Sequence, residues 1–274
     1  MAGIYVHIPF CRAKCLYCNF YSIPNRESID EYTSSVIDEL GMRRDYLNGE
    51  KIDTIYFGGG TPSIAGTDSI AGIIRAVHEG FDVASDPEIT LEANPDDIDS
   101  GFLSGLKDTG INRLSIGIQS FRDEDLRYLG RAHDAASAVS AIERSRDAGF
   151  SNLTIDLIYG IPGLDDESWK RNIDTATGYG IPHISAYALT VECDTPLERL
   201  IEKGKRDAPS EEDGARQFEI LMDEMRRREY IHYEISNFCR EGYISRHNSS
   251  YWKGIPYLGA GASAHSYDGK SRQW

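Results

Sequence analysis

The sequence predicts an α/β fold, a partial, six-unit TIM-like β/α barrel followed by a C-terminal α+β appendage. Two observations predict this class. Short apolar segments alternate with segments of helical period over residues 4–189, as in parallel strands joined by helical crossovers. The alternation stops near residue 190, whereas a complete eight-unit barrel takes about 250 residues. A doubly wound open sheet is the structural alternative, and in both folds ligands bind at the carboxyl ends of the strands.

The expected strands are short and apolar, and the expected helices have apolar residues at helical spacing. We expect the six strands of the barrel at Ile4–Ile8, Thr54–Phe57, Glu88–Glu92, Leu114–Ile118, Leu153–Leu157 and His183–Leu189. The helices between and after them are expected at Ile29–Tyr46, Ser69–His78, Phe102–Asp108, Asp123–Leu129, Ala135–Ala148 and Glu167–Thr177. In the appendage we expect two helices and a strand, at Pro196–Lys203, Glu211–Arg228 and Tyr230–Ile235.

The expected domains are a barrel core at residues 1–190 and an extension at residues 191–274 that closes the barrel mouth. The last residues carry no ending signal, so we expect a further C-terminal part. A net charge of −15 disfavours binding to nucleic acid, whose phosphates attract a basic face. The sequence has neither a signal peptide nor an apolar run of about 18 residues, which predicts a cytoplasmic protein without a membrane span.

Three of the five cysteines form the most specific motif of the chain. Cys11, Cys15 and Cys18 have the spacing C-x3-C-x2-C on one short loop after the first strand. Cysteine thiolates bind iron–sulfur clusters, and three of them would leave one iron of a cubic [4Fe–4S] cluster open to another ligand. A zinc site with His7 as fourth ligand is an alternative, although no second pair of ligands is nearby. The odd number of cysteines disfavours a disulfide framework.

Polar and glycine-rich signals follow several of the expected strands. The segment Gly58-Gly-Gly-Thr-Pro62 lies between a strand and a helix, where glycines permit close approach to a ligand or simply form a tight turn. Single polar residues at or beyond other strand ends are Glu92, Gln119, Arg131 and Asp156. Each has a structural explanation, such as a salt bridge for Asp156. Together they offer carboxylates and hydrogen bonds to a cationic, ribose-bearing ligand.

A cluster near the end of the chain combines histidine with aromatic residues. The segment His247-Asn248-Ser-Ser-Tyr251-Trp252 has the groups to bind a flat, metal-bearing ligand, since haem iron takes a proximal histidine in globins. The alternative is a loop whose aromatic residues plug the open barrel. The next segment, Tyr257-Leu-Gly-Ala-Gly-Ala-Ser-Ala-His265-Ser266, has small residues that would allow it to pass close beneath a cofactor.

Several of these motifs together resemble a known superfamily. The segment from Tyr5 to Cys11, followed by Cys15 and Cys18, resembles radical S-adenosylmethionine (SAM) proteins when it is combined with Gly58–Pro62. The segments that narrow the resemblance to the oxygen-independent coproporphyrinogen III oxidase group are Glu92–Pro95, Arg113–Phe121 and Asp156–Pro162. The resemblance covers nearly the whole chain and implies a partial barrel of the radical SAM type.

The resemblance implies two cofactors. Cys11, Cys15 and Cys18 would bind the [4Fe–4S] cluster, whose open iron would take the amino and carboxylate groups of SAM. The reduced cluster would pass one electron to the sulfonium and cleave SAM into methionine and a 5′-deoxyadenosyl radical. The positions that match the SAM contacts of the family are Tyr5, Gly59, Gly60, Thr61, Glu92, Gln119, Arg131 and Asp156.

Two departures from the oxidases point to a sister branch of haem chaperones. Oxidases of this group have a fourth cysteine where this chain has Phe20, and an N-terminal extension before the strand that starts here at Ile4. The motif of the chaperone branch implies haem binding by His247, Asn248, Tyr251 and Trp252. We therefore expect a chaperone that binds a cluster, SAM and haem, and that transfers haem to apo-haemoproteins.

Alternative functions remain within the same superfamily. The first is oxygen-independent coproporphyrinogen III oxidase, a radical SAM decarboxylase of porphyrin biosynthesis, which Phe20 disfavours. Another is a different radical SAM reaction on a tetrapyrrole. The expected partners are haem or another tetrapyrrole, an apo-haemoprotein acceptor, an electron donor and, in a homodimer, a second copy of the chain.

Overall fold

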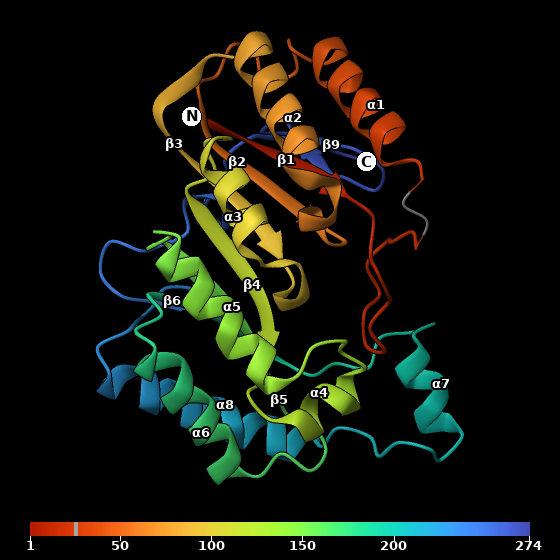
Figure 1. Ribbon diagram of the computed structural model, residues 1–274, viewed down its shortest axis with the longest axis vertical. Coiled ribbons are helices and arrows are strands. Elements are labelled where there is room, and N and C mark those ends of the chain that lie inside the picture. Colours follow the sequence, from red (N-terminus) through yellow and green to blue (C-terminus); the bar gives the residue numbers. More distant parts are fainter. Residues whose placement is uncertain (25–26) are drawn as a thin grey trace. The chain divides into compact units, whose positions relative to one another are not determined.

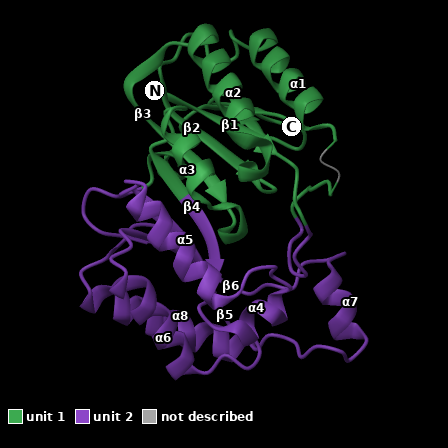
Figure 2. Cartoon of the chain, viewed as in Figure 1, with its two compact units in different colours: residues 1–12, 20–114, 245–274 green, residues 13–19, 115–244 purple. Residues whose placement is uncertain are grey.

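The computed structural model describes residues 1–24 and 27–274. The chain divides into two compact units, which Figure 2 shows in green and purple. The first unit consists of residues 1–12, 20–114 and 245–274, and the second of residues 13–19 and 115–244. The expected domains, a barrel core and an extension that meet at residue 190, are continuous stretches of sequence, whereas these units are not. The expected division stays a prediction.

The first unit is built on a mostly parallel sheet with the strand order β11-β10-β9-β1-β2-β3. Strand β1 pairs in parallel with β2 on one side and with β9 on the other, so a strand from the C-terminal region lies beside the first strand of the chain (Figure 1). The strands are β1 (Ala2–Ile8), β2 (Ile52–Gly59), β3 (Val83–Ala93), β9 (Tyr257–Ala260), β10 (Ser266–Tyr267) and β11 (Arg272–Gln273).

Helices supply the crossovers that parallel strands require. The helix between β2 and β3 buries Ile70, Ile73, Ile74 and Val77, the residues whose spacing predicted it. The short helix α9 packs against β1 and β2. The helices of the first unit are α1 (Ile29–Met42), α2 (Gly66–Gly80), α3 (Ser100–Lys107) and α9 (Arg246–Trp252), with the 3-10 turns Pro62–Ala65 and Pro95–Asp97.

The second unit has the strand order β4-β5-β6-β8-β7. Strands β5 and β6 are parallel, whereas β8 is antiparallel to both of its neighbours. The strands are β4 (Arg113–Gln119), within which the chain enters this unit, β5 (Leu153–Tyr159), β6 (His183–Ala188), β7 (Ile231–His232) and β8 (Asn237–Cys239). The helices are α4 (Asp123–Leu129), α5 (Ala135–Asp147), α6 (Asp166–Gly178), α7 (Pro196–Glu202) and α8 (Glu211–Arg227).

Local sequence explains where most of these helices begin. Helices α5, α6, α7 and α8 each follow a residue whose side-chain oxygen accepts a hydrogen bond from a backbone N–H of the first turn, and such a cap satisfies a donor that the helix itself leaves unpaired. These capping residues are Asp134, Asp165, Thr195 and Ser210.

The expected partial barrel is confirmed. In neither unit does the strand order close on itself, and β1-β2-β3 and β4-β5-β6 follow the chain without the reversal that marks a doubly wound sheet. No helix in the described part of the chain is long and apolar enough to cross a membrane.

Several element boundaries were wrong, and five strands and helices were missed. The strand expected to begin at Glu88 begins at Val83. The helix expected to reach Tyr46 ends at Met42, and turns follow up to Gly49. The strand expected over Tyr230–Ile235 is limited to Ile231–His232, because the chain turns back at once. The Tyr233 N–H donates to the Asn237 carbonyl at 3.3 Å and closes this hairpin. The missed elements are β8, α9, β9, β10 and β11.

Candidate functional site

Cys11 lies in the first unit, directly after β1, where its neighbours fix its position. Its N–H donates to the Ile23 carbonyl at 3.2 Å, and the Thr61 hydroxyl donates to its sulfur at 3.5 Å. The Thr61 N–H in turn donates to the Phe10 carbonyl at 2.8 Å. The loops that follow β1 and β2 therefore hold each other at the carboxyl ends of two neighbouring strands.

The glycines after β2 are needed for close packing. Gly59 has a φ of 110°, and a Cβ there would lie 2.5 Å from the His7 ring. A Cβ on Gly60 would lie 2.7 Å from the Phe10 carbonyl oxygen. The sequence pattern predicts close approach to a ligand, and the structure adds approach to His7 and to the cysteine loop. Contact of these glycines with SAM remains a prediction.

Glu92 lies near the carboxyl end of β3 with a fixed orientation. Its carboxylate accepts hydrogen bonds from the Tyr56 hydroxyl at 2.7 Å and from the Gly59 N–H at 3.2 Å. Burial raises the pKa of Glu92, and the two hydrogen bonds oppose this shift because they favour the charged form. A carboxylate held in this way is suited to accept hydrogen bonds from the hydroxyl or ammonium groups of a ligand.

Tyr5 and His7 form a second fixed group on β1. The two ring nitrogens of His7 are hydrogen-bonded, Nδ1 to the Tyr5 hydroxyl at 3.1 Å and Nε2 to the Tyr21 carbonyl at 3.3 Å. Burial lowers the pKa of His7 and raises that of Tyr5, so both side chains are uncharged at neutral pH. Tyr5 also stacks on Tyr56, with ring centroids 6.1 Å apart.

Cys15 and Cys18 lie in the second unit beside an arginine. Arg131 donates from its guanidinium to the Cys15 sulfur at 3.2 Å and to the Gly117 carbonyl at 2.9 Å. Burial raises the pKa of Tyr17, the nearby positive charge of Arg131 opposes this rise, and Cys15, Cys18 and Asp156 add to it. Arg131, Asp156, Cys15 and Cys18 therefore all lie near Tyr17. The predicted site residues Arg131 and Asp156 thus lie in the same region as the two cysteines.

Gln119 ends β4 in an unusual backbone conformation. It is 7% exposed and has a φ of 68°, a left-handed conformation that residues with a Cβ rarely adopt. Such positions cost about 1–3 kcal/mol and cluster at functional sites. This strain is independent of the motif that predicted Gln119 as a SAM contact.

The cysteines fit a metal cluster in their chemistry. Cys11, Cys15 and Cys18 are half-buried, and none forms a disulfide. Thiols of this kind are the ligands of [4Fe–4S] clusters, and Thr61 and Arg131 donate hydrogen bonds to two of them. Within residues 1–24 and 27–274 no three His, Cys, Asp or Glu side chains converge as a ready-made metal site. The cluster assignment therefore rests on spacing and donor type.

The predicted haem ligand His247 is enclosed by its neighbours. It is 2% exposed, and its Nδ1 and Nε2 are hydrogen-bonded to the hydroxyls of Thr54 at 2.7 Å and Tyr251 at 2.9 Å. Its ring stacks on Tyr56, with centroids 4.9 Å apart. Burial lowers the pKa of His247 to about 3, so it is neutral. Coordination of iron by His247 would require one of these hydrogen bonds to break.

A buried ion pair holds the start of the helix that carries His247. The Glu88 carboxylate accepts hydrogen bonds from the N–H groups of Arg246 at 3.1 Å and His247 at 3.0 Å. Arg113 lies 3.6 Å from the same carboxylate, and the side chains of Glu88 and Arg113 are only 6% and 2% exposed. The orientation of α9 therefore depends on Glu88.

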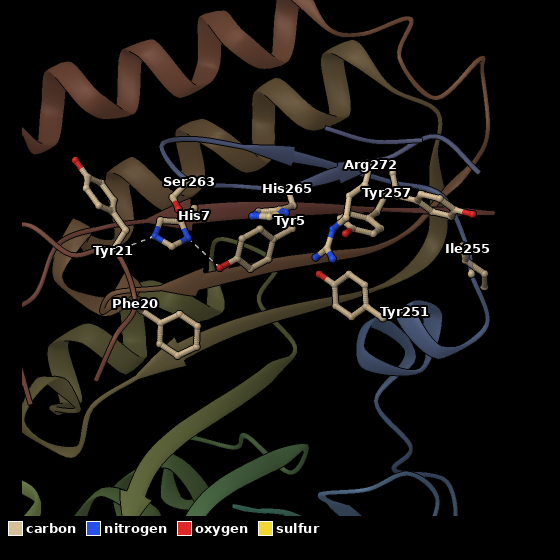
Figure 3. Close-up of a pocket in the computed structure, with 12 residues that line it drawn as sticks. Tyr5, His7, Phe20, Tyr21, Tyr251, Ile255, Tyr257, Ser263, His265 and Arg272 are labelled. Carbon is tan, nitrogen blue, oxygen red and sulfur yellow. Dashed lines mark hydrogen bonds between the residues drawn. The ribbon is translucent and has the colours of Figure 1, made fainter. Parts of the chain in front are cut away.

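The first unit also contains a large cavity (Figure 3). Its volume is about 650 Å³, within the 300–1,000 Å³ typical of ligand pockets. His7, His265 and Arg272 bring nitrogen atoms to its lining. Its walls are largely aromatic, formed by Tyr5, Phe20, Tyr21, Tyr251, Tyr257 and Tyr267.

Part of this cavity could be anticipated from the sequence. Tyr5, Tyr251 and His265 belong to motifs that predicted a ligand, whereas Tyr21 and Arg272 did not stand out. No sequence spacing marks these two residues. Tyr21 lies in the loop after β1, where its carbonyl is hydrogen-bonded to His7 Nε2, and Arg272 reaches the cavity through the pairing of β9 with β1 and of β10 with β9 and β11.

The fold and the cysteine motif together define a radical SAM protein. Residues 5–192 match the family model of the Radical SAM superfamily. The heme chaperone HemW of Mycobacterium tuberculosis (strain H37Rv) is 36% identical in an alignment 276 residues long that covers 99% of this chain and 71% of that protein. HemW of Bacillus subtilis (strain 168) is 37% identical in an alignment 275 residues long that covers 99% of this chain and 72% of that protein. Within the superfamily, the chain belongs to the HemW family.

A solved structure supports the same fold. Coproporphyrinogen III oxidase (HemN) from Escherichia coli, a radical SAM enzyme, superposes with a TM-score of 0.85 at 25% sequence identity. The match covers 99% of this chain and 66% of the HemN chain. This likeness agrees with the predicted relation to the coproporphyrinogen oxidase group.

Proposed function

We propose that the chain is a haem chaperone that binds a [4Fe–4S] cluster, SAM and haem and that transfers haem to apo-haemoproteins. The observation that carries this proposal is the similarity to HemW over 99% of the chain. The aromatic cavity supports it, because a flat tetrapyrrole packs well against aromatic rings. Phe20 is 63% exposed and lines this cavity. It stands where the coproporphyrinogen III oxidases that the sequence resembles have their fourth cysteine.

We assign the cluster to Cys11, Cys15 and Cys18. When it is bound and reduced, such a cluster supplies an electron to the sulfonium of SAM. Thr61 and Arg131 would orient two of the sulfurs through the hydrogen bonds that they donate. The residues that we assign to SAM from the sequence motifs are Tyr5, Gly59, Gly60, Thr61, Glu92, Gln119, Arg131 and Asp156.

An anaerobic preparation of the protein tests this function. We expect one haem per chain in an optical titration, and transfer of that haem to an apo-haemoprotein on mixing. Separate Cys11→Ala, Cys15→Ala and Cys18→Ala variants should each lose the brown absorbance of the cluster. A protein that binds haem only at large excess, or that never passes it to an acceptor, would contradict the chaperone proposal.

The likeness to HemN favours a second candidate, oxygen-independent coproporphyrinogen III oxidase. This activity would consume SAM and coproporphyrinogen III and release protoporphyrinogen with repeated turnover. The same anaerobic preparation, supplied with SAM and a reductant, separates the two functions. We expect no protoporphyrinogen above the level of a control without SAM, and catalytic turnover would replace the chaperone proposal with the oxidase.

A further inference from the structure

We propose that the cavity of the first unit is the haem site and that His265 supplies an axial ligand to the haem iron, while His247 only positions Tyr251. This inference rests on the proposed haem chaperone function. It names the site, the iron ligand and the group that pairs with a haem carboxylate, and it departs from the sequence motif, which points to His247.

The three histidines at or next to the cavity differ in what their nitrogens can do. His7 and His247 each have hydrogen bonds at both ring nitrogens. His265 lines the cavity, and neither of its ring nitrogens has a hydrogen-bond partner among residues 1–24 and 27–274. The buried unpaired atoms include His265 Nδ1 but not Nε2, so Nε2 is the ring nitrogen open to a ligand in the cavity. A neutral imidazole is a common metal ligand, and Nε2 of His265 can coordinate iron without breaking a hydrogen bond.

The loop that carries His265 is held by helix α1. The Gly261 N–H donates to the Glu39 carboxylate at 2.8 Å, and the Ala262 N–H donates to the Tyr32 hydroxyl at 2.9 Å. Arg43 donates to the Gly259 carbonyl at 2.8 Å. These bonds fix the backbone on the approach to His265, as expected for a residue that presents a ligand to a metal.

The charge of the cavity favours an anionic ligand. Arg272 lines it, and no Asp or Glu is among the described residues that do, although the whole chain carries a net charge of −15. Arg272 forms no ion pair within residues 1–24 and 27–274. Haem has two propionates, whereas SAM is a net cation at neutral pH because of its sulfonium and ammonium groups. A guanidinium is well suited to a propionate, with which it forms paired hydrogen bonds.

His247 affects the cavity only through the wall residue Tyr251. Tyr251 lines the cavity, and its ring meets that of Tyr257 edge-on, with centroids 4.8 Å apart. The Tyr251 hydroxyl is bonded to His247, which lies on the same helix but does not line the cavity. His247 thereby sets the orientation of Tyr251, and in this assignment it does not coordinate iron.

Optical titrations with two ligands test the assignment. Ferric haem has an iron to coordinate, whereas metal-free protoporphyrin IX has the same ring and propionates without it. We expect His265→Ala to weaken haem binding by about tenfold or more and to change the haem spectrum, but to keep protoporphyrin IX affinity within about twofold. Added imidazole should restore the wild-type haem spectrum. His247→Ala should weaken both ligands alike and leave the haem spectrum unchanged.

Arg272 provides a second variant on an exposed side chain that does not endanger folding. Arg272→Gln should weaken both ligands about fivefold, as expected for one exposed ion pair. Arg44→Gln removes an exposed arginine of the first unit that does not line the cavity, and it should leave both affinities unchanged.

The outcomes separate this inference from the function on which it rests. If the wild-type protein binds no haem, the chaperone proposal fails. If the wild type binds haem and His265→Ala retains its spectrum and affinity, the site assignment fails while the function stands. A spectral change in His247→Ala instead of His265→Ala would return the ligand to the sequence motif.

Discussion

His247 and His265 lie in the same unit and in neighbouring sequence motifs, yet their surroundings are opposite. The ring of His247 is enclosed, with both nitrogens bonded and 2% of the residue exposed. The ring of His265 is half-buried at a cavity wall, without a hydrogen-bond partner in the described chain. A conspicuous histidine motif can therefore serve packing, while a less conspicuous histidine keeps its nitrogens free for a ligand.

The largest effect on stability should come from removing Glu88, which holds the start of the helix that carries His247. Glu88→Ala removes a buried carboxylate that pairs with the buried Arg113 and that accepts hydrogen bonds from two N–H groups of α9. We expect a loss of about 3–5 kcal/mol in the free energy of unfolding, measured by chemical denaturation. Asp82→Ala is the control, because its ion pair with Lys51 is exposed and should contribute less than about 1 kcal/mol. Equal effects of the two substitutions would contradict the anchoring role.

The two histidines should differ in their contribution to stability. His247→Ala deletes a buried side chain and leaves the Thr54 hydroxyl without its partner, so we expect a loss of about 2–4 kcal/mol. His265→Ala removes no hydrogen bond and should change the unfolding free energy by less than about 1 kcal/mol. Denaturation of both variants under one condition checks this. A larger loss for His265→Ala would reverse the comparison.

The enclosure of His247 also predicts a dependence of stability on pH. Its folded pKa of about 3 lies below the ordinary value of 6.5, so between these values the unfolded chain binds a proton that the folded chain does not. Stability should therefore fall as the pH drops below about 6.5, with His247 contributing up to about 1.4 kcal/mol per pH unit. Unfolding free energies at pH 6.5, 6.0 and 5.5 should decline less steeply for His247→Ala than for the wild type. Parallel declines would show that His247 is not the enclosed group.

The smallest effect concerns the link between His247 and the cavity wall. Tyr251→Phe removes the hydroxyl bonded to His247 Nε2 and keeps the ring. Because Tyr251 is 43% exposed, water can partly replace the lost partner, and we expect a loss of about 1 kcal/mol in the unfolding free energy. In the His247→Ala background the same substitution should have almost no effect, and a double-mutant cycle measures this coupling. Additive losses would contradict the link.

The sequence predicted the strands and helices of the barrel because their apolar residues follow regular periods, as at Ile70, Ile73, Ile74 and Val77 of α2. It also marked the cysteine loop and the polar strand ends, whose residue types are specific to their chemistry. It could not predict the pairing of β9 with β1, since four residues carry too short a pattern to choose a partner. The cavity depends on this pairing, so Arg272 had no local signal.

The same limit explains the ambiguity at His247. A sequence displays the residue type but not the neighbours that occupy its nitrogens. Thr54 lies far away along the chain, and only the packing of α9 against β2 brings its hydroxyl to His247 Nδ1. The unpaired ring of His265 is equally a product of tertiary structure, and the small residues around it predicted only a close approach to a cofactor.

Electron paramagnetic resonance of the ferrous nitrosyl haem complex reports which histidine binds the iron. An axial histidine adds a nitrogen hyperfine splitting to the nitrosyl signal, which is absent when the iron has no such ligand. We predict this splitting in the wild-type protein and in His247→Ala, and its loss in His265→Ala. A splitting that survives in His265→Ala and disappears in His247→Ala would show that His247, and not His265, is the axial ligand.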